Sequence, residues 1–118
     1  MTPASASGVG LPRTYLRPCL LLLLSEGPSH GYELLDAVRD LEMPSAEAGG
    51  LYRSLRAMDE EGLVRSWWEP SESGPARRTY AITRSGRQAL ARHMAEVDRV
   101  SSLLTDLVAR YRLSADRT

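Results

Sequence analysis

The hydrophobic residues of this 118-residue chain recur at three- and four-residue spacing in three successive segments, which predicts three amphipathic helices. The segments are residues 15–25, a second that opens at Ser29 or His30 and runs to Leu41, and a third that opens near Ser45 and ends at the Glu-Gly pair 61–62. Glycine or proline follows each segment closely, so we expect three separate helices rather than one.

After the third segment the pattern changes to alternation, which predicts two β-strands. Residues 63–69 and 77–83 alternate, with Tyr80 and Ile82 on one face of the second strand. Residues 70–75 consist largely of Pro, Ser and Gly and predict a loop. We therefore expect a β-hairpin with a long tip.

From residue 84 onward the chain returns to a helical period, with no Gly or Pro after Gly86. Its apolar stripe comprises Leu90, Met94, Val97, Val100, Leu104, Leu107, Val108 and Tyr111. This stripe is too broad for the surface of a monomer, so we expect it to be buried across a two-fold homodimer interface.

The elements predict a mainly α protein with a small β-hairpin. Residues 1–12 have no apolar period and are expected to form a disordered leader. Residues 13–83 are expected to form a winged helix-turn-helix domain, residues 84–113 a dimerisation helix and residues 114–118 a tail. In a winged helix-turn-helix, the third helix enters the DNA major groove and the hairpin tip contacts the neighbouring backbone or the minor groove.

Charge is balanced in total but not along the chain. Fifteen basic and fifteen acidic residues give a net charge of zero. Residues 26–47 hold six acids and one arginine, whereas residues 65–92 hold six arginines and two acids. A basic face that binds phosphate is therefore compatible with the neutral total.

Several classes of function are disfavoured by composition. One cysteine and two histidines cannot build a disulfide framework, a zinc cluster or a Cys/His or Ser/His/Asp catalytic set, so we expect no metal, no cofactor and no enzymatic activity. The apolar run 19–24 is far shorter than the ~20 residues of a membrane span. A cytoplasmic protein is expected.

Three sequence blocks carry a more specific resemblance. They are HGYELL at 30–35, GGLYRSLRAMDEEGLV at 49–64 and GPARRTYAITRSGRQAL at 74–90. Together they resemble the signature blocks of the PadR family of transcriptional regulators, over roughly residues 14–110. The single C-terminal helix is similar to that of the short subclass. The resemblance implies a dimeric repressor that binds a near-palindromic operator in double-stranded DNA and, as in many members, releases it when a small planar aromatic effector arrives.

The same resemblance implies which residues meet DNA. These are Tyr32, Gly50, Tyr52, Arg53 and Arg56 on the helices and Arg77 and Arg78 on the wing. Gly50 stands where the family usually has a hydroxyl residue, and Thr79 where it usually has a tyrosine. The base preference is therefore expected to differ from that of relatives.

Other interpretations of these residues stay open from the sequence alone. Tyr52 could be a core residue, and the wing arginines could pair with Glu69 or Glu72 across the hairpin. Trp67 and Trp68 are neighbours on one strand and must point to opposite faces, one of them buried. They could stack on a planar ligand or pack the wing onto the helices. As a whole, the chain could also be a winged-helix module that binds a protein instead of DNA.

Overall fold

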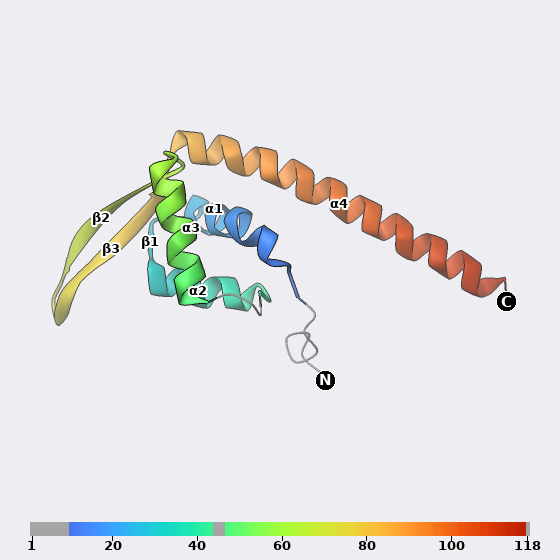
Figure 1. The fold of residues 1–118 in the computed structure, drawn as a ribbon, viewed down its shortest axis with the longest axis horizontal. Helices are drawn as coiled ribbons and strands as arrows, with labels where there is room; N and C mark the ends of the chain where they lie inside the picture. Colours follow the sequence, from blue (N-terminus) through green and yellow to red (C-terminus); the bar gives the residue numbers. More distant parts are fainter. Residues whose placement is uncertain (1–9, 44–46, 118) are drawn as a thin grey trace.

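The computed structural model describes residues 10–43 and 47–117. A short 3-10 turn, η2 (Arg13–Tyr15), leads into α1 (Leu16–Ser25), followed by α2 (Gly31–Asp40) and α3 (Ala48–Glu60). These helices pack together as one bundle (Figure 1). Most of the predicted leader, and the expected helix start at Ser45, lie outside the described residues.

The hydrophobic periods of the three helices supply the core. α3 shows the pattern clearly, because Leu51, Leu55 and Met58 are fully buried and follow one another at helical spacing. They pack with apolar residues of α1, α2 and the sheet, namely Leu20, Leu21, Leu24, Leu34, Val38, Met43 and Val64. The opposite face of α3 is left free for other contacts.

A three-stranded antiparallel sheet of order β1-β3-β2 joins the helices, with β1 at Ser29–His30, β2 at Val64–Ser71 and β3 at Gly74–Ile82. Strand β1 was not predicted from the sequence, because two residues are too few to show alternation. The predicted loop is too long: the strands continue through most of residues 70–75, and only the two residues 72–73 separate them. The hairpin extends away from the helices as the wing (Figure 1).

The last helix, α4 (Arg84–Asp116), begins where Thr83 Oγ1 accepts a hydrogen bond from the Gly86 amide at 3.0 Å. It continues past residue 113 into the segment expected to be a tail, since no helix breaker stops it. The first turns pack on the domain, and the rest leaves it on the side opposite the wing (Figure 1). The fold class, mainly α with a small winged sheet and a long C-terminal helix, is confirmed.

Part of the predicted apolar stripe of α4 belongs to the core of its own chain. Leu90 is half-buried against that core, next to the buried Ala89. Further along, Val100, Leu104 and Leu107 are exposed, with Leu104 showing 56% of its surface. The exposed stripe therefore begins about three turns later than the spacing alone predicts.

Candidate DNA-binding surface

The exposed face of α3 carries three of the predicted contact residues. Tyr52, Arg53 and Arg56 lie on the surface, with Tyr52 39% exposed. The alternative that Tyr52 is a core residue is therefore wrong, since the core face of α3 is formed by other side chains. Exposed side chains on the third helix of this fold are those that reach a major groove.

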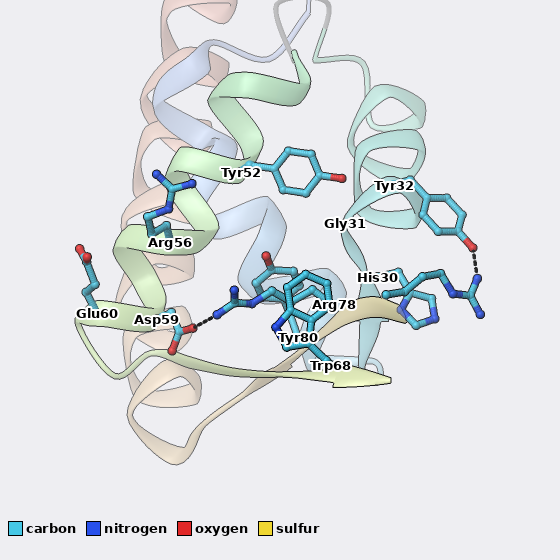
Figure 2. A pocket seen from close by; sticks show the side chains of 11 residues that line it. His30, Gly31, Tyr32, Tyr52, Arg56, Asp59, Glu60, Trp68, Arg78 and Tyr80 are labelled. Carbon is cyan, nitrogen blue, oxygen red and sulfur yellow. Dashed lines mark hydrogen bonds and ion pairs between the residues drawn. The ribbon is translucent and has the colours of Figure 1, made fainter. Parts of the chain in front are cut away.

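A cleft of about 710 Å³ lies between α3, the first turn of α2 and the wing (Figure 2). Six residues predicted from the sequence line it: Tyr32, Tyr52, Arg56, Trp68, Arg77 and Arg78. The buried Tyr80 of β3 also lines it, and burial raises the pKa of its hydroxyl, which therefore stays neutral. Helix-side and wing-side candidates thus face one shared cavity.

Gly50 and Arg53 lie elsewhere on α3, beside η2 and the start of α1. They border a second depression together with Arg13 and Arg17. Arg17 forms a two-pronged ion pair with Glu61, at 2.7 and 3.1 Å, and this hydrogen bonding lowers the pKa of the Glu61 carboxyl. Arg13 was not among the residues predicted from the sequence, because it precedes the motif blocks.

The two wing arginines contact different neighbours. Arg77 donates a hydrogen bond to the Tyr32 hydroxyl at 2.6 Å, and its guanidinium lies 5.9 Å from that ring centroid. Arg78 donates to Ser66 Oγ at 2.9 Å and lies 3.7 Å from an Asp59 carboxylate oxygen. The contacts with Tyr32 and Asp59 link the wing to α2 and α3, whereas the hydrogen bond to Ser66 joins β3 to β2. Within the described residues, neither arginine forms the ion pair with Glu69 or Glu72 that one interpretation expected.

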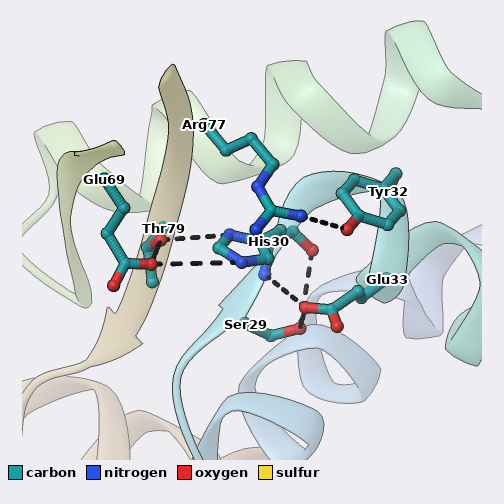
Figure 3. Close-up of polar contacts among 7 residues, drawn as sticks. All are labelled: Ser29, His30, Tyr32, Glu33, Glu69, Arg77 and Thr79. Atoms are coloured by element: carbon teal, nitrogen blue, oxygen red, sulfur yellow. Dashed lines mark hydrogen bonds and ion pairs between the residues drawn. The ribbon is translucent and has the colours of Figure 1, made fainter. Parts of the chain in front are cut away.

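A chain of polar contacts fastens the base of the wing to the start of α2 (Figure 3). The buried Thr79 hydroxyl donates to Glu69 at 2.5 Å and lies 3.0 Å from His30 Nδ1. Because the single hydroxyl proton goes to Glu69, His30 Nδ1 must be the donor to Thr79 Oγ1. Thr79, noted for differing from the family pattern, is thus a structural link between strand and helix.

The same chain continues into α2 through its first acidic residue. Glu33 accepts hydrogen bonds from the His30 backbone amide at 3.1 Å and from the Ser29 hydroxyl at 3.2 Å. The backbone hydrogen bond is the largest cause that lowers the pKa of the Glu33 carboxyl. His30 therefore occupies the N-cap position of α2, and the orientation of this helix relative to the sheet is well defined.

The paired tryptophans have different surroundings. Trp68 is 63% exposed at the cleft, with the Arg78 guanidinium 5.5 Å from its ring centroid. Trp67 is half-buried, with Arg65 4.9 Å from its ring centroid. The expectation that one ring would be buried is wrong, because the wing extends away from the helices that would cover it (Figure 1).

Three helices followed by a winged sheet, with arginines from both parts around one cleft, are the arrangement of a winged helix-turn-helix protein. The model of the PadR-like family of transcriptional regulators matches residues 20–92, more than half of the chain. The chain belongs to this family.

Solved structures agree with this assignment, and one curated protein is similar in sequence. A PadR-like transcriptional regulator from Bacillus cereus is 27% identical, with a TM-score of 0.73 over 81% of this chain and 93% of that chain. Bacillus subtilis PadR, solved in complex with operator DNA, has the same fold at 23% identity, with a TM-score of 0.60 over 67% of this chain and 46% of that chain. An uncharacterized 37.1 kDa protein of transposon TN4556 from Streptomyces fradiae is 30% identical over 82 residues, which span 70% of this chain and 23% of that protein.

Across residues 10–43 and 47–117, no helix combines the length and the apolar character that crossing a bilayer requires.

Proposed function

We propose that this chain is a dimeric repressor that binds a near-palindromic operator and releases it when a small planar ligand binds. The observation that carries the proposal is the shared cleft, which Tyr52 and Arg56 of α3 line together with Arg77 and Arg78 of the wing. Guanidinium groups and a tyrosine hydroxyl on one open surface can contact several phosphates of one duplex. Residues 13–83 would form the DNA-binding unit.

The two groups of residues have different roles in this proposal. On α3, Arg53 and Arg56 are exposed and can reach a guanine edge in the major groove, with Tyr52 beside them on phosphate. On the wing, Arg77 and Arg78 contact the backbone and carry no base preference. Tyr32 holds Arg77 in place and adds its own hydroxyl, while Gly50 allows close approach of the backbone.

A dimer would bring two such surfaces to one operator. An apolar groove of about 720 Å³ runs along α4 beside η2 and α1, and its lining includes Tyr15, Leu22, Val97, Leu104 and Val108. A second copy of α4 would bring its own exposed apolar side chains to this groove. The interface would comprise Met94, Val97, Val100, Leu104, Leu107, Val108 and Tyr111, with Leu90 serving mainly its own core. Two-fold symmetry then presents the α3 helices to half-sites ~34 Å apart.

Ligand release is the part of the proposal that involves the tryptophans. Trp68 is exposed on the cleft and can stack on a planar ring, and Trp67 lies on the opposite face of the same strand. Binding of an aromatic compound next to Arg78 would compete with phosphate for the same guanidinium. Fluorescence quenching by a panel of aromatic acids and drugs tests this step.

Binding to a protein instead of DNA is the second candidate, favoured by the acids Asp59 and Glu60 that also line the cleft. Selection from a random-sequence duplex library separates the two. The proposed function predicts enrichment of a two-fold symmetric site that the protein shifts in a gel. If no sequence is enriched and no duplex is retained at low salt, the DNA-binding proposal is wrong.

A further inference from the structure

The first residue of α2 is Gly31, and the side chain of Tyr52 from α3 lies next to it. Gly31 is buried, and the Tyr52 side chain extends from α3 toward it across the cleft (Figure 2). A Cβ atom on Gly31 would lie 2.7 Å from Tyr52 Oη and 2.8 Å from its Cζ. Both separations are shorter than real Cβ contacts, so any side chain at residue 31 would displace the Tyr52 ring.

We propose that Gly31 is a positioning residue for Tyr52 in DNA recognition. By leaving the space above the first turn of α2 empty, it lets the ring lie against that turn and fixes the hydroxyl at the edge of the cleft. The inference rests on the proposed function, in which Tyr52 contacts DNA. It adds that affinity depends on a residue that touches no DNA.

The backbone conformation of Gly31 does not explain why residue 31 is a glycine. Among the glycines of the described ranges, positive φ angles occur at Gly27 and Gly62, where the chain turns. Gly31 instead begins a helix, and glycine is a poor helix former, costing up to ~1 kcal/mol relative to alanine in a helix interior. The requirement for glycine at this position therefore comes from the space that Tyr52 occupies.

Displacing Tyr52 is expected to leave the fold intact. The atoms that a Cβ on Gly31 would meet form the far end of a flexible side chain that is 39% exposed. Gly86 offers a matched control with the opposite property. There a Cβ would overlap the backbone carbonyl oxygen of Leu63 and lie 2.6 Å from Ile82 Cγ1. Backbone cannot swing aside, so alanine should harm folding at Gly86 and spare it at Gly31.

The test combines a double-mutant cycle with stability measurements. Affinities for the duplex that the wild-type protein selects from a random library are measured for wild type, Gly31→Ala, Tyr52→Ala and the double variant. Gly31→Ala should weaken binding by about tenfold or more, the scale of one hydrogen bond to a charged phosphate. The double variant should bind like Tyr52→Ala alone. Thermal unfolding of Gly31→Ala should be unchanged or shifted upward, whereas Gly86→Ala should unfold at lower temperature.

A measurement without DNA separates the positioning role of Gly31 from the DNA contact of Tyr52. In the free protein, NOEs between the Tyr52 ring and the Gly31 Hα protons report that the ring packs on Gly31. In the Gly31→Ala variant, the NOEs between the Tyr52 ring and residue 31 should be absent. Equal weakening by Gly31→Ala with and without Tyr52, or unchanged affinity of Gly31→Ala beside a weakened Tyr52→Ala, would overturn the role of Gly31. Unchanged affinity of Tyr52→Ala with the NOEs present would overturn the DNA contact of Tyr52 itself.

Discussion

Replacing Leu104 with arginine tests how the proposed dimer is held together. Leu104 lies in the groove along α4 and exposes 56% of its surface in the single chain. Burying a leucine contributes ~1.5–3 kcal/mol, and an unpaired buried charge costs several more. Since the residue occurs twice in a two-fold dimer, the variant should lose roughly 6 kcal/mol or more of association free energy.

Such a loss corresponds to a dimer dissociation constant raised by about four orders of magnitude. Analytical ultracentrifugation at tens of micromolar should therefore give a dimer for the wild-type protein and a monomer for Leu104→Arg. Because Leu104 packs in no core of its own chain, circular dichroism of the variant should keep its helical signal. Specific operator binding should be lost even though α3 and the wing are unaltered.

Ser102→Arg is the matched control. It adds the same charge to an exposed position of α4, two residues away and outside the groove lining. This variant should remain a dimer. A monomeric wild-type protein, or a Leu104→Arg protein that dimerises as tightly as Ser102→Arg, would refute the placement of the interface in this groove.

Three further changes probe the wing and the core. Arg77→Ala combined with Arg78→Ala should weaken binding to all duplexes. The slope of log K against log salt concentration should become shallower by about 0.9 for each phosphate that is no longer neutralised, which gel-shift titrations at several salt concentrations measure. Gly86→Ala should destabilise the fold by about 1–3 kcal/mol in urea titrations, because its Cβ would overlap the Leu63 carbonyl oxygen. Trp68→Phe should remove most of the fluorescence response to any planar ligand that occupies the cleft. An undiminished response would show that the ligand binds outside the cleft.

Much of the architecture could be predicted because the periodic elements are long. The spacing of Leu51, Leu55 and Met58 predicts both α3 and its buried face, and residues 84 onward predict a long final helix. The pattern could not show which of several possible partners an apolar residue packs against. Leu90 has the spacing of the exposed stripe, yet it packs on its own domain, which only the tertiary arrangement decides.

The residues that line the cleft were predicted only in part, and their contacts were not predicted. Motif blocks identified Tyr52, Arg77 and Arg78, while the partners of the wing arginines, Tyr32 and Asp59, come from elements distant in sequence. The importance of Gly31 was equally hidden. A sequence shows that a glycine is present, but not that a tyrosine ring from another helix fills the space a side chain would need.

The salt dependence of binding to the selected duplex tests DNA recognition by this surface. Four wing arginines per dimer, each neutralising one phosphate, predict that log K falls linearly with log salt with a slope of about −3.6 or steeper. The Arg77→Ala and Arg78→Ala double variant, measured in parallel, should show a shallower slope on the same duplex. A slope near zero for the wild-type protein would contradict phosphate contact by these arginines and, with it, the assignment of the cleft to DNA.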